Sequence, residues 1–363
     1  MTTQEDTQMI KVLMAGVDRS TKGGMWSVAE NYLKDEALRR QIRLTYIPTA
    51  SSGSKGKRLA CFIGGTARIL ANLIFARPDV VHLHVSERGS VRRKALIARM
   101  AHSFGCRVAL HMHGAEFQTW YESLDEKGRQ RVRSFLSGAD RVLILGEYWR
   151  GFIGGLTDAP EKLRVLYNAV PVPAENKFDP GAAQLLFLGE VGQRKGAYDL
   201  LQAMQRIDAQ LPPETQLILY GPNPDGDIQA RIDALQLGSR VRYGGWADQQ
   251  TKDTAFAKTA VNILPSYHEG LPMTLLEAMA RGIPCITTPV AAIPEAVDDA
   301  NGVLLPPGDV PALADAILRL VQEPEARCAK SHSAYQRMKE RFSMESHRTA
   351  LMQIYQEMTE MRK

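Results

Sequence analysis

The two halves of the chain follow the same plan, in which an apolar strand leads to a glycine-containing loop and then a helix. In the first half, the apolar residues 11–16 precede a Gly23-Gly24 loop, and a helical pattern covers Met25 to Leu38. In the second half, the apolar residues 185–189 precede a helix expected from about Ala197. Strands that alternate with helices favour parallel sheets. The sequence therefore predicts an α/β protein with two Rossmann-like, doubly wound domains.

Further apolar strands and one proline-rich stretch define the expected domains. The strands are Val80–His84, Arg107–His111, Arg141–Leu145, Gln216–Tyr220, Val241–Gly244, Val261–Leu264 and Cys285–Thr288. The stretch Val170–Asn176 is rich in proline and lacks periodicity, so we place the domains at residues 1–172 and 173–342. Residues 343–363 have apolar side chains at helical spacing and are expected to pack against a domain surface.

The composition is that of a soluble globular protein. The chain has 363 residues, 44% of them hydrophobic and 23% charged, which suffices for two full cores. No basic-then-apolar leader opens it, and the apolar region Leu59–Ala76 is interrupted by two glycines, a threonine and Arg68, so we expect it not to span a bilayer. The four scattered cysteines show no metal spacing and predict reduced thiols in a cytoplasmic protein.

Positive charge is concentrated in the first half. Residues 1–175 contain 26 lysines and arginines against 17 aspartates and glutamates, and the rest of the chain is net acidic. A basic cluster beside apolar residues can dock on anionic lipid or bind a lipid-linked pyrophosphate, although a solvated basic face gives the same pattern. No nucleic-acid recognition module is found, so no nucleic-acid partner is expected. The residues of this predicted acceptor or membrane face are Lys55, Lys57, Arg58, Arg88, Arg92, Arg93 and Lys94.

Two acids flank the start of a predicted helix in the second half. Glu269 follows a buried strand, Pro272 marks the helix start, and Glu277 lies about one turn inside the helix. Ligands of open α/β sheets bind at this edge, where free helix N–H groups attract phosphate and carboxylates accept hydrogen bonds from sugar hydroxyls. The pair therefore indicates a nucleotide-sugar site, although a helix-dipole contact at Glu269 and a solvated Glu277 explain the pattern too.

Two further loops carry candidate chemistry. The turn 189–196 places Lys195 beside a helix start, which suits a diphosphate but is weak evidence alone, since a surface lysine is equally common. His113 follows a strand, where a neutral imidazole can contact a sugar hydroxyl. His82 and His84 alternate on another strand without a carboxylate at suitable spacing, so no metal site is predicted.

The stretch from Ser266 to Gly282 resembles the E-x7-E motif of the retaining glycosyltransferases of family 4, which have the GT-B fold. The match continues through residues 282–284, 288–290, 293–295 and 301–303, and it extends more weakly over nearly the whole chain. The resemblance implies two Rossmann-like domains that face each other across a cleft. It also implies that the terminal helix returns to the first domain.

The resemblance implies metal-independent transfer from a UDP- or GDP-linked sugar, with Glu277 on the ribose and Glu269 on the donor sugar. The implied catalytic residues are Glu269, His113 and Lys195. The implied donor-binding residues are Gly23, Gly24, Glu190, Arg194, Lys195, Gly270, Leu271, Pro272, Met273 and Glu277. Glu190 stands where the family usually has an arginine, and Arg194 is the candidate to supply the missing charge.

The relatives that this chain resembles build bacterial capsule or exopolysaccharide. They imply a lipid-linked saccharide acceptor and peripheral contact with the inner face of the cell membrane. Two alternatives remain open: a transferase with a soluble acceptor, and a catalytically weak homologue that binds a sugar-lipid or a partner transferase.

Overall fold

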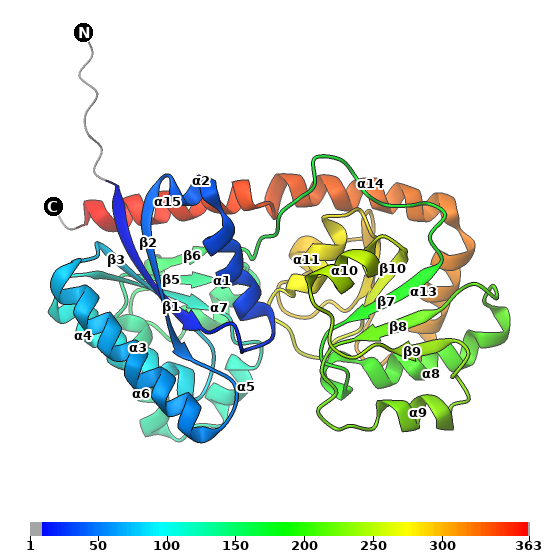
Figure 1. Cartoon of the computed structure of the whole chain (residues 1–363), viewed down its shortest axis with the longest axis horizontal. Coiled ribbons are helices and arrows are strands. Elements are labelled where there is room, and N and C mark those ends of the chain that lie inside the picture. The colour runs from blue at the N-terminus through cyan, green and yellow to red at the C-terminus, as the bar shows by residue number, and fades with distance from the viewer. Residues whose placement is uncertain (1–8, 362–363) are drawn as a thin grey trace, which may run out of the picture. The chain divides into compact units, whose positions relative to one another are not determined.

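The protein consists of two compact units (Figure 1), described here from a computed structural model. The structure describes residues 9–361, and residues 1–8 and 362–363 of the expected first domain and terminal helix lie outside the described residues. Unit 1 comprises the chain up to Asn168 together with His347 onward, and unit 2 comprises Ala169–Ser346. The division thus falls a few residues before the expected boundary at 172.

Unit 1 is built on a parallel sheet with the strand order β2-β1-β3-β4-β5-β6. Register pairs Val12 of β1 with Leu44 of β2 and with Val80 of β3. Helices cover both faces of the sheet, so strand side chains are buried on either side. The strands are β1 (Ile10–Val17), β2 (Ile42–Ala50), β3 (Val80–Val85), β4 (Arg107–Met112), β5 (Arg141–Ile144) and β6 (Leu163–Val165).

The first predicted helix of unit 1 is wrong in one respect, because residues 25–38 do not form a single helix. The Asp35 carboxylate accepts a hydrogen bond from the Leu38 N–H at 3.0 Å, which caps a second short helix. The helices of this unit are α1 (Gly24–Lys34), α2 (Glu36–Arg39), α3 (Lys55–Phe75), α4 (Gly89–Ser103), α5 (Phe117–Glu122), α6 (Glu126–Ser137), α7 (Tyr148–Gly154) and α15 (Met344–Glu360), with a 3-10 turn η1 (Pro160–Lys162).

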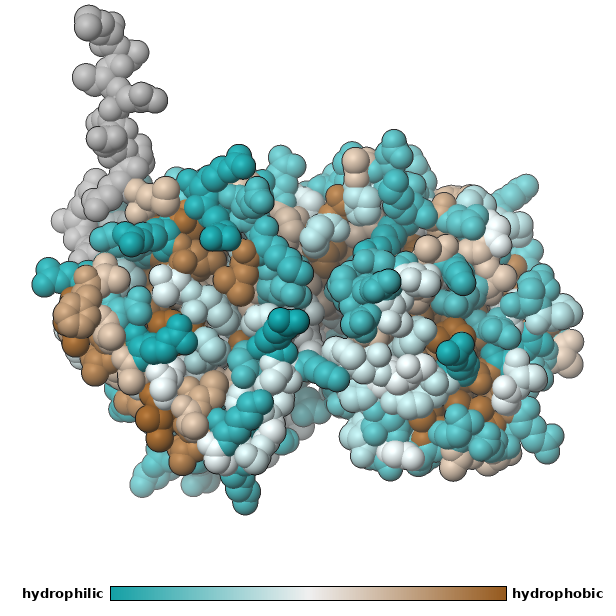
Figure 2. Space-filling model, in the orientation of Figure 1, coloured by the Kyte–Doolittle hydropathy of each residue, from teal (hydrophilic) through white to brown (hydrophobic). Residues whose placement is uncertain are grey.

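Helix α3 exposes a long apolar face. Gly65, Ile69 and Leu73 are buried on the side that packs along β2. By length and composition alone α3 is apolar enough to cross a membrane, and 17% of its most apolar window is buried. The glycines and Arg68 therefore do not lower its hydropathy as far as expected. Hydrophobic side chains gather along this helix in Figure 2, and the large exposed ones are Leu59, Ile63, Leu70, Ile74 and Phe75.

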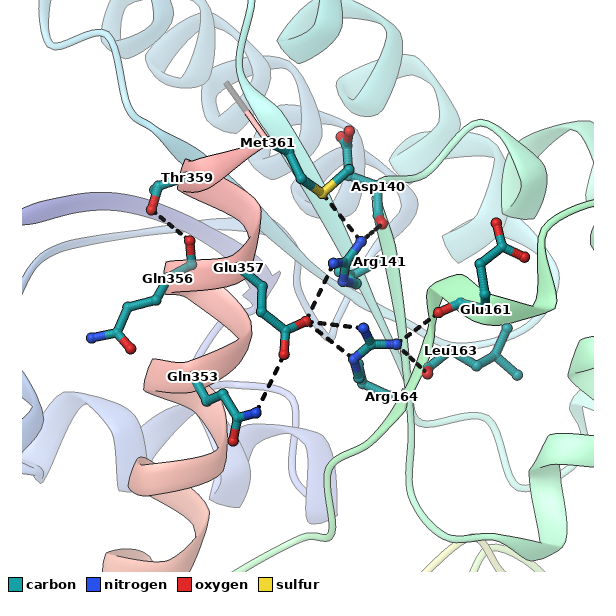
Figure 3. A network of polar contacts seen from close by, with 10 residues as sticks. All are labelled: Asp140, Arg141, Glu161, Leu163, Arg164, Gln353, Gln356, Glu357, Thr359 and Met361. Carbon is teal, nitrogen blue, oxygen red and sulfur yellow. Dashed lines mark hydrogen bonds and ion pairs between the residues drawn. The ribbon is translucent and has the colours of Figure 1, made fainter. Parts of the chain in front are cut away.

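The C-terminal helix α15 is anchored to unit 1 by buried and partly buried polar contacts. His347 contacts the Tyr32 hydroxyl at 2.7 Å, and Tyr355 contacts His82 at 2.7 Å. Glu357 forms ion pairs with Arg141 at 3.2 Å and Arg164 at 3.0 Å (Figure 3). The same helix closes the apolar core with Leu351, Ile354 and Met358.

Unit 2 is built on a second parallel sheet with the order β12-β11-β10-β7-β8-β9. The strands are β7 (Gln184–Leu188), β8 (Leu217–Tyr220), β9 (Val241–Tyr243), β10 (Thr259–Leu264), β11 (Cys285–Thr287) and β12 (Gly302–Leu304). The helices are α8 (Ala197–Ile207), α9 (Ile228–Ala234), α10 (Gln249–Phe256), α11 (Met273–Met279), α12 (Ile293–Ala296), α13 (Val310–Gln322) and α14 (Pro324–Arg341), with 3-10 turns η2 (Gln193–Lys195) and η3 (Asp208–Gln210). Two doubly wound parallel sheets confirm the predicted fold class.

Candidate functional site

The candidate site in unit 2 lies at the point where the strand order reverses. Strand β7 pairs with β8 on one side and with β10 on the other. The chain runs outward from β7 to β9, and then returns to build β10, β11 and β12 on the other side. The chain therefore leaves β7 toward one side of the sheet and leaves the adjacent β10 toward the other side. In α/β proteins, a crevice for ligands lies between two such connections, at the carboxyl edge of the sheet. The two candidate loops leave this edge, one after β7 and one after β10.

The loop after β7 is held against the loop after β10. Gly196 has a φ of 71°, and a Cβ at this position would collide with the carbonyl oxygen of Pro265. The Tyr267 N–H donates to the Arg194 carbonyl at 2.9 Å. Only glycine allows both the left-handed backbone and this close approach. The turn thereby places Lys195 at the second loop.

Glu269 is the centre of this arrangement. Its side chain is 5% exposed, and its carboxylate contacts the Lys195 ammonium. The same carboxylate accepts a hydrogen bond from the Ser266 hydroxyl at 2.8 Å. The partners come from both loops, so the position of the carboxylate is fixed by each of them. A buried carboxylate paired in this way is a charged hydrogen-bond acceptor in a fixed position.

Glu277, on the second turn of α11, is paired with a residue that the sequence analysis missed. The Lys252 ammonium, from α10, donates to both carboxylate oxygens at 2.9 and 2.7 Å. Both side chains are 15% exposed. The negative charge of Glu277 is therefore offset by Lys252, and a ligand hydroxyl that binds this carboxylate shares its oxygens with the lysine. No local sequence signal identifies Lys252, because its partner is 25 residues away.

Glu190 and Arg194 form an ion pair at 3.4 Å within the first loop. The pair cancels the negative charge at the position where an arginine was expected. Arg194 therefore compensates the charge of Glu190, and a ligand that binds Arg194 must share it with that acid.

The segment Gly270–Met273 is buried at the start of α11. Pro272 precedes the first helical residue, Met273, and the Thr274 hydroxyl donates to the Leu188 carbonyl at 3.0 Å. This contact ties the helix start to the end of β7. The backbone of the segment thus lies at the same sheet edge as Glu269.

The remaining candidate residues belong to unit 1. Gly23 caps α1 with a φ of 132°, which suits a glycine loop after β1. His113 follows β4, and its backbone N–H donates to the Val85 carbonyl at 2.7 Å. In unit 2 the structure brings Lys195 into contact with Glu269, next to the 270–273 segment that leads into α11 with Glu277. It places Gly23, Gly24 and His113 in unit 1.

His113 is part of a histidine network that spans β3, β4, α1 and α15. It contacts His84 at 2.9 Å, and His82 contacts His111 at 3.2 Å. His347 completes the network, and its Nδ1 donates to the Tyr167 carbonyl at 2.7 Å, so its Nε2 accepts from Tyr32. The network is hydrogen-bonded and neutral, because burial disfavours the imidazolium form.

Burial sets the protonation of all five rings. It lowers the pKa of His82 and of His113 to about 3 and that of His347 to about 4. It also lowers the pKa of His84 and of His111 well below the ordinary value. At neutral pH, His113 is therefore a neutral donor and acceptor, as expected for contact with a sugar hydroxyl.

Three of these rings could offer ligands to a metal ion. One nitrogen from each of His82, His84 and His111 lies within 4.8 Å of the others. Both nitrogens of His82 already have partners, whereas Nε2 of His84 and of His111 has no hydrogen-bond partner among residues 9–361. The contacts of His82 favour a hydrogen-bonded network over metal ligation, and the absence of a metal stays a prediction.

The predicted basic face divides into buried and exposed members. Lys94 is 2% exposed and Arg93 is half-buried, whereas the other members are exposed. The exposed ones are Lys55, Lys57, Arg58, Arg88 and Arg92.

Unit 2 is thus a doubly wound α/β domain whose sheet edge carries a lysine, a buried carboxylate and the start of a helix. A family model described as "Glycosyl transferases group 1" matches residues 182–323, which include this site. The glycogen synthase of Mycobacterium tuberculosis is 30% identical over 296 residues, covering 77% of this chain and 69% of that protein. The chain belongs to the group 1 glycosyl transferases.

Two other similarities extend the comparison. The O-antigen chain mannosyltransferase B of Escherichia coli is 31% identical over 146 residues, covering 39% of this chain and 38% of that protein. The crystal structure of Anabaena Alr3699/HepE in complex with UDP and glucose has a TM-score of 0.74 at 16% identity, covering 96% of this chain and all of that chain. The latter similarity shows that the fold is shared, which agrees with the predicted GT-B architecture.

Proposed function

We propose that this protein transfers a sugar from a nucleoside diphosphate sugar to a lipid-linked saccharide acceptor in surface polysaccharide synthesis. The observation that carries the proposal is the contact of Lys195 with Glu269 at the reversal point of the unit 2 sheet, where the following helix α11 carries Glu277. A cation suits the phosphates of such a donor, and two carboxylates suit its hydroxyl groups. The UDP and glucose bound by the HepE structure and the O-antigen role named for the mannosyltransferase support the choice of donor and product.

In this proposal Glu277 binds the ribose hydroxyls and Glu269 binds those of the donor sugar. Lys195 and the backbone of residues 270–273 stabilise the diphosphate as it leaves, when negative charge accumulates on its oxygens. This charge stabilisation comes from the protein, so turnover should not change when a chelator removes divalent metal. Transfer proceeds with retention, which the anomeric configuration of the product reveals by NMR spectroscopy.

The first experiment is thermal unfolding of the protein with UDP, GDP and ADP separately, in the presence of a chelator. A ligand at a hundred times its dissociation constant adds about 2.7 kcal/mol to the free energy of unfolding, which is visible as a shift. A shift with one nucleotide supports the donor site and identifies the base. No shift with any of them would contradict the proposed transferase and favour a homologue that only binds a partner or sugar-lipid.

The basic and apolar residues of α3 support peripheral contact with an anionic membrane at the cytoplasmic face. The exposed Lys55 and Lys57 lie at the start of the helix whose exposed face carries Leu59 and Ile63. We expect the protein to float with anionic vesicles but not with neutral ones. Changing Lys55 and Lys57 to glutamine should abolish flotation, whereas the same changes at Lys127 and Arg131, two exposed cations of α6, should not.

A further inference from the structure

We propose that unit 1 contains a pocket for a phosphate group, formed by Lys94, Arg93 and Ser51, and that this phosphate belongs to the lipid-linked acceptor. The inference rests on the proposed function, because it assigns the group through which unit 1 recognises the acceptor. The proposal gives Arg93 and Lys94 a different role from the exposed members of the basic face. Those exposed residues remain in contact with solvent or with the membrane.

Lys94 is a buried amine without an anionic partner, and burial, followed by the charge of Arg93, lowers its pKa to about 7. Its side chain is 2% exposed, and its ammonium donates to the Thr49 hydroxyl at 2.5 Å. Thr49 in turn donates to the Gly16 carbonyl at 3.2 Å, so its oxygen is free to accept from Lys94. No ion pair of Lys94 occurs within residues 9–361. Burial of the charged form without a partner is costly, and an anionic ligand would offset that cost and favour the ammonium form.

Two further polar groups, one after β2 and one on α4, also lack partners. The Nε of Arg93 and the hydroxyl of Ser51 are buried and make no hydrogen bond to any described residue. Ser51 is 8% exposed and directly follows β2, whereas Arg93 and Lys94 are neighbours on α4. Burial, followed by the charge of nearby Arg58, lowers the pKa of Arg93. A guanidinium, an ammonium and a hydroxyl together match the acceptor oxygens of a phosphate.

The position of these groups in the sheet is that of a ligand site. Strand β1 lies between β2 and β3, and the strand order of unit 1 reverses there. Thr49 and Ser51 lie at the carboxyl end of β2, and Lys94 belongs to the helix that follows β3. The carboxyl ends of strands beside such a reversal are where α/β proteins bind ligands.

The nearby carboxylates do not neutralise this pocket. Asp18 accepts hydrogen bonds from the Ser20 N–H at 3.0 Å and from the Ser20 hydroxyl at 2.6 Å. Glu87 lies toward β4, where a Cβ at Gly114 would collide with its carboxylate. Neither acid forms an ion pair with Arg93 or Lys94 among the described parts of the chain.

The surroundings favour a phosphate that is attached to a lipid. Helix α3 packs against α4, and its first turns carry Arg58 next to the exposed Leu59 and Ile63. An apolar face beside a cationic pocket matches a molecule that joins a hydrocarbon chain to a phosphate. A free sugar phosphate offers the charge but leaves the apolar face without a partner.

The test is calorimetric titration with inorganic pyrophosphate and, separately, with farnesyl diphosphate. Both titrations use the Lys195→Ala background, which weakens phosphate binding in unit 2. We expect Lys94→Met and Arg93→Met to weaken binding at least about tenfold, because each removes one charged partner of the anion. Arg99→Met, an exposed cation of the same helix, is the matched control and should change nothing. Lys94→Met should fold, because methionine replaces the apolar stem of the lysine.

The two ligands separate the possible sources of the phosphate. Tighter binding of farnesyl diphosphate supports a lipid-linked acceptor, whereas equal binding of both overturns that assignment and indicates a soluble phosphate. Binding of neither, or an equal loss in Arg99→Met, overturns the pocket. The thermal shifts with UDP, GDP and ADP are measured on the protein with Lys195 intact. Absence of those shifts would contradict the proposed transferase, whereas the titrations with pyrophosphate and farnesyl diphosphate would still test the phosphate pocket.

Discussion

At the residue scale, the candidate donor site is already organised by ion pairs before a ligand binds. Glu269 is held by Lys195 and Ser266, and Glu277 by Lys252. A donor diphosphate at Lys195 must share that cation with Glu269. The pairs keep buried carboxylates compensated, which lowers the cost of placing two acids beside a phosphate site.

The two acids should respond differently to truncation. Glu277→Ala is expected to raise the dissociation constant of the nucleotide about tenfold or more, because a charged hydrogen-bond acceptor for the ribose is lost. Glu269→Ala is expected to lower kcat about 100-fold with a smaller effect on nucleotide binding. Titration with the nucleotide and steady-state kinetics measure the two effects. Equal, mild effects from both would contradict the assigned roles, and Glu214→Ala, at an exposed position of unit 2, is the control.

At the element scale, the positions of strands were easier to predict than the residues at which helices end or the residues that helices contact. Buried strands are continuous apolar runs, and β3, β4, β7 and β10 lie where such runs were found. The break between α1 and α2 depends on one side chain, Asp35, whose capping contact competes with continuation of the helix. Periodicity alone does not reveal that competition.

The polar contacts of α15 predict how firmly this helix is attached. Glu357→Ala should lower the free energy of unfolding of unit 1 by about 1 kcal/mol, because Arg141 and Arg164 lose their shared carboxylate. Glu360→Ala removes the same kind of side chain from an exposed position of the same helix and should have no effect. Chemical denaturation of both variants measures the difference. A loss of equal size in Glu360→Ala would show that helix propensity, not the ion pairs, is responsible.

At the scale of the whole molecule, the histidine network, with four buried rings and the half-buried His113, makes the stability of unit 1 depend on pH. Burial holds their folded pKa values at about 3 to 4 or well below the ordinary 6.5. Between those values the unfolded chain binds protons that the folded chain does not, so stability falls as the pH drops below 6.5. Each such histidine contributes about 1.4 kcal/mol per pH unit in this range.

Thermal unfolding between pH 7.5 and 4.5 tests this dependence. The protein should lose stability steeply below pH 6.5, and His347→Gln should flatten the slope because one such group is removed. His332→Gln, at an exposed position of unit 2, should leave the slope unchanged. If His347→Gln left the slope of stability against pH unchanged, His347 would be protonated in the folded protein as it is in the unfolded chain, which would contradict the prediction.

The sequence by itself determined the two βα halves, the glycine loops and the pair of acids around the start of α11. These features are local, because strand, turn and helix preferences act over a few neighbouring residues. Only the tertiary structure decided that Lys252 pairs with Glu277, that Arg194 pairs with Glu190, and that Lys94 is buried without a counter-ion. The physical reason is that strand order and helix packing bring together charges far apart in the chain, and the energy of a charge depends on how deeply it is buried and on what lies next to it.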